Sequence, residues 1–326
     1  METLTLTETT DNAVAAENRI STGKPFIEAN TIPATLGEIR EKHLIPVFAK
    51  DNQPVISQSD FISLTADVVQ HIFQRETVLP PSIRLSHPIK GRVPEAKDKP
   101  AHLLREEEKT IYYERMAFIL EIPTISETIN GNPLTLTVGG IKAHNQDNLY
   151  ARKGAEEHFK VFIGFQNRVC TNMCVWTDGV RETLRIRSMD ELTEAIIGVI
   201  ENYDAKRHLN TMSRFTDRHI DEDQFAYLIG RARMYQHIPP TYKKELPQLL
   251  FGDNQIGMVV KEYYNDDSFS REDDGSLNLW KLYNLFTSAN KSSYIDGFLN
   301  RGLNAFGFVR GIMEAMENDK GSWFLR

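Results

Sequence analysis

Cysteine is almost absent from this chain: among 326 residues only Cys170 and Cys174 occur. Three residues separate them, one more than in the usual redox or zinc-binding pair, and there is no second pair. Free cysteine is among the most buried residue types. We therefore expect two reduced thiols in the core, with no disulfide and no metal bound by them.

The sequence also contains no long apolar run and no excess of basic over acidic residues. No segment approaches the roughly 20 apolar residues that a membrane span needs. Residues 1–30 have neither the basic start nor the apolar block of a signal peptide. The net charge is −7, which argues against a broad basic surface for duplex DNA but leaves room for a local basic groove. We expect a cytoplasmic protein with no membrane partner.

Familiar catalytic and nucleotide-binding motifs do not occur. The chain contains no GxxxxGK[ST], GxGxxG, GxSxG or HExxH pattern. P-loop, Rossmann, hydrolase and zinc-protease chemistry therefore have no support from the sequence. The sequence identifies no cofactor and no metal, and it favours a non-catalytic protein over an enzyme.

Composition and periodicity divide the chain into three parts. Residues 1–30 are polar and aperiodic, and we expect them to be disordered or loosely attached. Residues 31–180 begin with helical spacing and continue with alternating segments, which predict an N-terminal helix and an antiparallel β-meander. Residues 181–326 predict a helical half packed on the strands, in the same domain or a second one. The expected fold class is α+β.

Local signals refine this division. The turn Asn130 to Pro133 lies between two alternating segments and predicts a chain reversal. The charged segment from Arg92 to Lys109 predicts a long loop, either functional or mobile. Ser188 and Glu191 form a capping-box pattern, which predicts a helix that could continue to about Thr216.

The segment Phe162 to Trp176 mixes polar side chains into an apolar, β-rich run. The polar side chains belong to Gln166, Asn167, Arg168 and Asn172. Because buried polar groups need partners, this mixture predicts a polar network in the core or a site at the ends of strands. We expect Arg168 to pair with a carboxylate in such a network and, with Asn172, to link the strands to the helical half. Arg168 could instead activate Cys170 as a nucleophile.

Three blocks of this sequence resemble a known family. They are the polar loop Lys142 to Tyr150, the Arg-Val-Cys-x-Asn segment Phe165 to Cys174, and the Trp-x-x-x-Asn-x-x-Thr segment Leu279 to Thr287, which an Arg301-containing helix follows. In this respect the chain resembles phage/plasmid-like proteins of unknown function, which prophages, plasmids and conjugative elements carry. It looks like the branch from mobile elements of anaerobic gut bacteria.

The resemblance implies a mobile-element context and marks motif positions for a polar network or a site. These positions are Asn145, Asp147, Arg168, Cys170, Asn172, Trp280, Asn284 and Arg301. In the first block His-Asn-Gln-Asp-Asn replaces Ser-His-Asp-Gly, so no role of a His followed by Asp is carried over. Asn145 and Asp147 could supply part of a metal site, or they could satisfy the backbone of a tight turn.

The helical half interleaves basic and aromatic residues. The pattern begins around Lys206 and Arg207, and its candidate nucleic-acid-binding residues are Arg231, Arg233, Tyr235, Tyr242, Lys243 and Lys244. Cations follow the backbone of a single strand while aromatic rings stack on its bases. The same region carries nearly as many acidic residues, so a solvated helix face is the favoured explanation of the pattern.

Three functional hypotheses follow. The first is a non-catalytic nucleic-acid-binding protein of DNA recombination or single-strand annealing, with single-stranded DNA as partner. The second is an accessory protein that binds a host protein to counter restriction or another defence. The third is a metal-dependent enzyme built around Asn145, Asp147 and the segment from Arg168 to Asn172. A positively charged groove would favour the first hypothesis, an acidic face would favour the second, and a closed polar pocket would favour the third. All three hypotheses are compatible with an oligomer.

Overall fold

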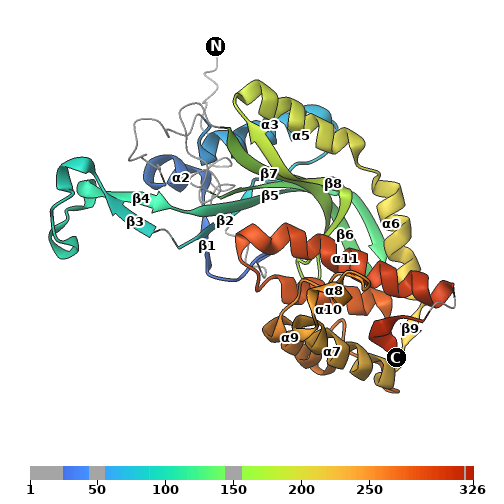
Figure 1. Ribbon diagram of the computed structural model, residues 1–326. Coiled ribbons are helices and arrows are strands. Elements are labelled where there is room, and N and C mark those ends of the chain that lie inside the picture. The colour runs from blue at the N-terminus through green and yellow to red at the C-terminus, as the bar shows by residue number, and fades with distance from the viewer. Residues whose placement is uncertain (1–24, 44–55, 88, 144–155, 319–320) are drawn as a thin grey trace, which may run out of the picture.

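An antiparallel sheet of six strands forms the centre of the molecule (Figure 1). The computed structural model describes residues 25–43, 56–87, 89–143, 156–318 and 321–326. The strands lie in the order β1-β2-β5-β6-β7-β8, and the last four form the expected meander. Their bounds are β1 (Thr31–Ala34), β2 (Ser82–Ser86), β5 (Arg115–Ile129), β6 (Asn132–Ala143), β7 (Glu157–Asn167) and β8 (Met173–Ile186).

The turn between β5 and β6 is the reversal that the sequence predicts. Ile129 pairs with Asn132, so Asn130 and Gly131 form a two-residue loop. Their φ angles are 49° and 75°. Asn and Gly tolerate this left-handed conformation best, and the resulting turn matches the twist of the two strands.

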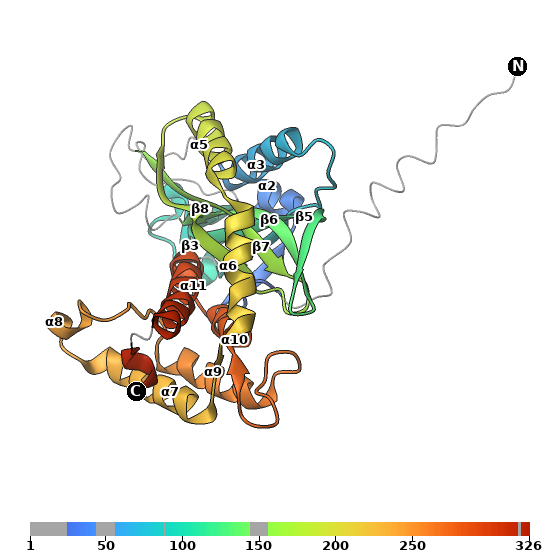
Figure 2. The same ribbon diagram turned by 90° about the vertical axis from the view of Figure 1, so that its right-hand side faces the viewer.

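The two faces of the sheet bury different partners, because successive side chains of a strand point to opposite sides. On one face lie α3 (Gln58–Ile72) and α5 (Met189–Asn202), where the Phe61 ring contacts Phe118 and Phe159 at centroid distances of 5.1 and 4.8 Å. On the other face, the beginning of α11 (Ile295–Glu317) packs Phe298 against the sheet. Figure 2 shows the sheet between these two layers of helices.

The rest of the helical half continues from one end of the sheet (Figures 1 and 2). Its other helices are α6 (Ala205–Arg214), α7 (Glu222–His237), α8 (Pro240–Lys243), α9 (Asp253–Asn265) and α10 (Leu279–Asn290). The short strands β9 (His219–Ile220) and β10 (Leu277–Asn278) pair with each other beside them. Side chains of α10 such as Trp280 share one apolar cluster with sheet residues such as Trp176. The fold is therefore α+β, as the sequence predicts.

Residues 25–30 are an exception to the expected loose N-terminal segment. Phe26 and Ile27 are only 2% and 0% exposed and pack with Phe298 of α11. The backbone N–H groups of Glu28 and Ala29 donate to the carbonyl of Lys291 at 2.9 and 3.1 Å. The prediction is wrong for these residues, because one apolar pair is enough to anchor a polar segment to the sheet. Residues 1–24 lie outside the described residues.

The helix expected to run from Ser188 to about Thr216 is two helices. Ser188 caps α5 as predicted, accepting the N–H of Glu191 at 3.2 Å. The chain then leaves the helix at Tyr203, whose backbone is extended, and Asp204 caps α6 by accepting the N–H of Arg207 at 2.9 Å. Asp204 is a cap residue inside an otherwise uninterrupted helical pattern, and its side chain restarts the helix in a new direction.

The segment from Arg92 to Lys109, expected to be a long loop, connects two short strands and contains short 3-10 turns. β3 (Ile89–Arg92) and β4 (Lys109–Tyr113) form a two-stranded ribbon, and three short 3-10 turns close its tip. The ribbon projects from the body of the molecule (Figure 1). None of the described helices is long and apolar enough for a membrane span.

Candidate functional site

Two of the three motif blocks meet in a buried network of amide side chains centred on Asn284 of α10. The Asn284 Oδ1 accepts from Asn167 Nδ2 at 3.1 Å, and its Nδ2 donates to the Trp280 carbonyl at 3.0 Å. Asn172 Nδ2 donates to the Asn284 carbonyl at 3.0 Å, and Trp280 Nε1 donates to Asn132 Oδ1 at 2.8 Å. These side chains are between 0% and 9% exposed. Asn172, Trp280 and Asn284 thus join the strands to the helical half.

Arg168 is not part of this network. Its side chain is 57% exposed, and its Nε lies 3.7 Å from Glu121 Oε1 at the surface. The expectation of a carboxylate partner is met, but the expectation of burial is wrong. At the end of β7 the side chain of Asn167 points inward, and strand alternation sends the next one, Arg168, outward.

The two cysteines differ in their surroundings. Cys174 is buried and free, and burial raises its thiol pKa far above the ordinary value, so it stays protonated. Cys170 is a half-buried thiol, and its Sγ lies 3.9 Å from Asn284 Oδ1. Cys170 therefore lies beside the amide network.

The remaining motif positions lie elsewhere. Arg301, on α11, donates from Nε to the Leu250 carbonyl at 3.0 Å and ties α11 to the segment before α9. Asn145 and Asp147 lie outside the described residues. Within the described part of the chain, no group of three His, Cys, Asp or Glu side chains is arranged to hold a metal ion.

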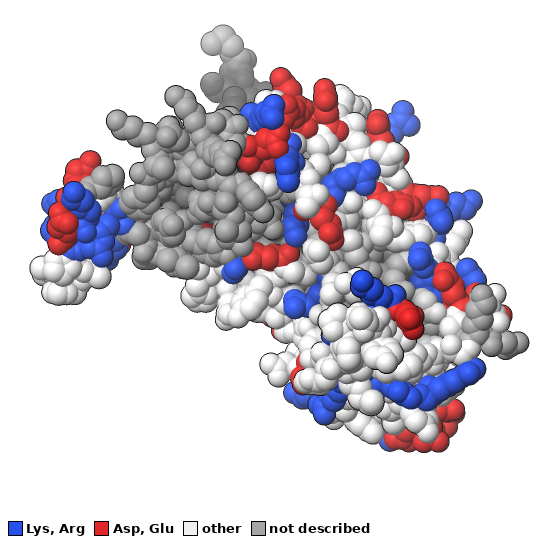
Figure 3. Space-filling model, in the orientation of Figure 1, with Lys and Arg blue, Asp and Glu red and all other residues white. Residues whose placement is uncertain are grey.

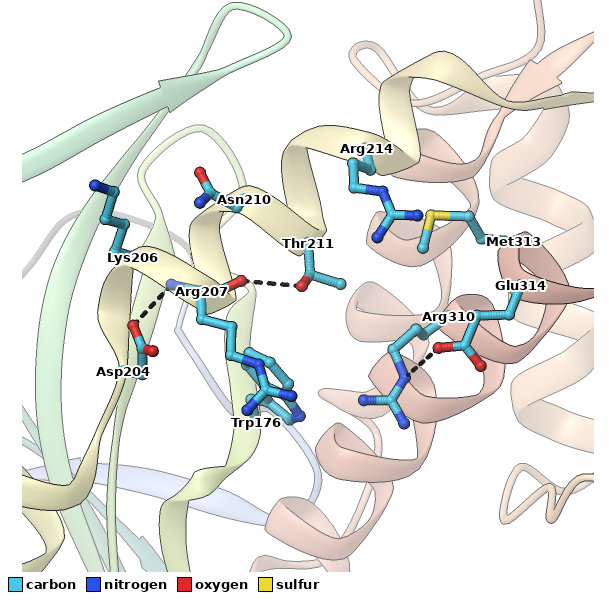
Figure 4. Close-up of a pocket in the computed structure, with 10 residues that line it drawn as sticks. All are labelled: Trp176, Asp204, Lys206, Arg207, Asn210, Thr211, Arg214, Arg310, Met313 and Glu314. Atoms are coloured by element: carbon cyan, nitrogen blue, oxygen red, sulfur yellow. Dashed lines mark hydrogen bonds and ion pairs between the residues drawn. The ribbon is translucent and has the colours of Figure 1, made fainter. Parts of the chain in front are cut away.

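A groove between α6 and α11 gathers basic side chains (Figure 4). Its volume is about 440 Å³. Four basic and two acidic residues contribute to its lining, together with Trp176 of β8. The lining residues are Trp176, Asp204, Lys206, Arg207, Asn210, Thr211, Arg214, Arg310, Met313 and Glu314.

The helical repeat of α6 explains why its polar side chains reach the groove. The helix buries His208 and Met212 against the core. Lys206, Asn210 and Arg214 follow each other at intervals of four residues, which places them along one side of the helix. Arg310 comes from α11, more than ninety positions later in the chain, and completes the groove from the opposite wall.

An aromatic ring forms the floor of the groove. Trp176 is 5% exposed and packs against Phe306 at a centroid distance of 5.4 Å. The Arg207 guanidinium carbon lies 4.9 Å from the centroid of the Trp176 ring. This cation–π contact holds the guanidinium in place while its N–H donors keep their charge and can still bind an anion. Figure 4 shows Arg207 beside Trp176, with Arg214 and Arg310 on the two walls.

The cations of the groove differ in how far carboxylates already neutralise them. Arg214 pairs with Glu317 at 2.6 Å, and Arg310 pairs with Glu314 at 3.3 Å. Lys206 and Arg207 have no carboxylate within ion-pair distance among the residues that the structure describes. These two side chains are therefore the ones best able to bind an anionic ligand.

His208 lies beneath the groove and does not supply acid–base chemistry to it. It is 0% exposed, and burial lowers its pKa to about 3. Its Nδ1 lies 2.7 Å from the Tyr203 hydroxyl. The ring is therefore neutral at physiological pH and forms part of an aromatic cluster with Trp176 and Phe306.

The candidate nucleic-acid-binding residues of the sequence do not form one open surface. Tyr235 is only 6% exposed, and Lys243 Nζ lies 5.1 Å from its ring centroid. Arg231 rests on Trp323, with 4.7 Å between the guanidinium carbon and the ring centroid. Tyr235 is therefore unavailable for stacking on a base, because it lies on the stripe of α7 that faces the core.

The other candidates are more accessible. Arg233 Nε lies 3.8 Å from Asp253 Oδ1, Tyr242 is 64% exposed, and Lys244 is exposed. Sequence reasoning included Lys206 and Arg207 in the basic pattern but missed Trp176 and Arg310 as groove residues. The four-residue spacing on α6, after the Asp204 cap, is the signal that points to this helix.

Comparison with known proteins matches almost the whole chain to a family model. The model described as "Domain of unknown function, B. Theta Gene description (DUF3871)" matches residues 7–325. No curated protein and no solved structure matches the chain.

Proposed function

The chain belongs to this family of domains of unknown function, so we propose its function from the geometry of the groove. The proposed function is non-catalytic binding of single-stranded nucleic acid between α6 and α11. The observation that carries the proposal is the convergence of four cations on one concave surface of a chain whose net charge is −7. Lys206 and Arg207 contact the phosphate backbone first, because no described carboxylate pairs with them. Grooves of this kind hold single strands by their phosphates.

A single strand suits the groove better than a duplex does. The groove is small, and on the face shown in Figure 3 basic and acidic side chains are interspersed, with no broad positive surface for a rigid duplex. Trp176 is nearly covered by its neighbours, so affinity depends on charge and hydrogen bonds more than on base stacking. We therefore expect binding with little sequence preference and a strong dependence on salt.

The biological setting is part of the same proposal. Sequence-independent binding of single strands is what recombination and strand annealing require. The resemblance to phage/plasmid-like proteins supports such a role in the DNA metabolism of a mobile element. Binding of a host protein is the alternative that gains if nucleic acid does not bind.

Fluorescence anisotropy with labelled oligonucleotides tests the proposal. Single-stranded DNA should bind more tightly than duplex DNA in low salt. The double variant Lys206→Ser/Arg207→Ser should bind more weakly, and the slope of log affinity against log salt should fall by about 0.7 for each phosphate that the variant no longer neutralises. The matched control is Lys42→Ser/Lys261→Ser, which removes two exposed cations outside the groove.

Two outcomes would overturn the proposal. One is the absence of binding in low salt at about 10 µM protein, where a weak electrostatic ligand binds best. The other is an equal loss of affinity in the groove variant and the control variant. Circular dichroism must show that both variants fold as the wild type does.

A further inference from the structure

The projecting ribbon of β3 and β4 continues the ladder of the central sheet. Leu85 of β2 pairs with Met116 of β5, and five residues further out on both strands Lys90 pairs with Ile111. The register is therefore the same in the sheet and in the ribbon, apart from an irregularity between Ile89 and Lys90. The chain leaves the sheet along β2, forms the ribbon, and returns along β5. We call residues 89–113 the arm.

Among the residues that the structure describes, the outer edges of the arm have no neighbouring strand. β3 and β4 pair with each other in a separate two-stranded sheet, and in the described residues neither pairs with any other strand. A two-stranded ribbon is marginally stable alone, and its outer edges offer unpaired N–H and C=O groups. Leu103, at the tip, adds an apolar side chain that is 56% exposed. These features are typical of a surface that a partner covers.

The charges of the arm argue against nucleic acid as that partner. Lys99 pairs with Glu108 at 2.6 Å, Arg105 lies 3.1 Å from Glu107, and Lys109 pairs with Glu106. Carboxylates of the arm thus already neutralise these cations. Figure 3 shows basic and acidic side chains side by side on the arm. Phosphates would have to displace these carboxylates, whereas a protein strand would not.

We propose that the arm is a dimerisation element, and that its partner is the arm of a second copy of this chain. The arm contains six basic and five acidic residues, whereas the whole chain has a net charge of −7. Two copies therefore repel each other over most of their surfaces, but their arms do not. The arm is therefore a part of the chain at which the overall negative charge does not keep two copies apart.

The edge of β4 is the contact. Its last four residues, Thr110 to Tyr113, are β-branched or aromatic, the types that favour strand pairing. Two identical edges can pair antiparallel about a twofold axis, because each then presents the same surface to the other. The product is a four-stranded sheet made of two arms, with backbone hydrogen bonds between the copies.

Light scattering coupled to size-exclusion chromatography tests the proposal. Wild-type protein at about 50 µM should have a molar mass twice the 37.3 kDa of one chain. In an armless variant, the dipeptide Asn-Gly replaces residues 88–113 and links His87 to Glu114. Because the register of β2 and β5 is unchanged, a two-residue turn can close this hairpin. The armless variant should be monomeric and keep the wild-type melting temperature and circular dichroism.

A point variant tests the β4 edge without deleting the arm. Tyr112→Lys places a charge on the edge, which is how natural edge strands avoid pairing. It should be monomeric, whereas the matched control Tyr227→Lys, at a 54% exposed tyrosine on α7, should remain dimeric.

The outcomes are clear-cut. A monomeric wild-type protein at this concentration, or an armless variant that folds and still dimerises, overturns the proposal. If the wild type is monomeric and deletion of the arm instead abolishes oligonucleotide binding, the arm contacts nucleic acid.

Discussion

Asn284 satisfies polar groups that would otherwise be buried without partners. Its side chain accepts from Asn167 and donates to the Trp280 carbonyl, and all three residues are 0% exposed. Asn284→Ala leaves the Asn167 amide without its acceptor and opens a cavity, so it should reduce the free energy of unfolding by about 2–4 kcal/mol. The control is Arg168→Ala, which removes an exposed ion pair and should cost less than about 1 kcal/mol. Urea denaturation followed by circular dichroism measures both.

A similar loss of stability in the two variants would contradict this account of the motif.

The sequence predicts a buried polar network from Asn172 and its neighbours, because polar residues interrupt an apolar run. It does not show whether Asn167 or Arg168 points inward, since a shift of one residue exchanges the two faces of a strand. Charge made Arg168 the more conspicuous candidate, whereas the short, neutral Asn167 is the one that fits the core.

His208 makes stability depend on pH. Burial lowers its pKa from 6.5 to about 3, so the unfolded state binds a proton between these values and the folded state does not. The stabilisation is complete above pH 6.5 and falls with pH by up to about 1.4 kcal/mol per unit until the folded-state pKa is reached. His208→Phe should weaken this dependence, and urea denaturation between pH 7 and pH 4.5 measures the difference. Equal slopes in the two proteins would rule out His208 as the source.

At the scale of elements, the sequence predicted that a helix or turn exists better than it predicted where that helix ends. The Asn130-Gly131 turn and the start of α5 after Ser188 follow from local chemistry. The break at Asp204 was not predicted, because no Gly or Pro interrupts residues 199–216, although Asp204 is a cap residue that accepts the N–H of Arg207. Within the arm, the segment from Arg92 to Lys109 was expected as a loop because it is charged and contains proline, and the structure forms three short 3-10 turns there.

In the groove, too, the sequence predicts what depends on neighbouring residues and misses what depends on contacts between distant segments. The spacing of Lys206, Asn210 and Arg214 can be read along α6, because it is one helical face. Their proximity to Arg310 depends on how α11 crosses the end of the sheet, which no local pattern specifies. Sequence reasoning therefore finds one wall of the groove and misses the other.

At the scale of the whole molecule, chain segments far apart in sequence cover one face of the sheet. Phe26 and Ile27 share an apolar cluster with Phe298 of α11 and with Phe162 of β7. The carbonyl of Lys291, just after α10, holds the backbone of the same N-terminal segment through the N–H of Glu28 at 2.9 Å. The N-terminal segment thus secures the helical half to the sheet.

Two truncated chains test this role of the N-terminal segment. A chain that begins at Thr31 lacks Phe26 and Ile27, whereas one that begins at Pro25 retains them. Each buried side chain of this kind contributes about 1.5–3 kcal/mol, so the shorter chain should be less stable by at least about 3 kcal/mol. Thermal and urea denaturation compare the two chains, and Phe26→Ala in the longer one should account for a large part of the difference. Equal stability would mean that the contacts of residues 25–30 add nothing beyond the entropy lost in ordering them.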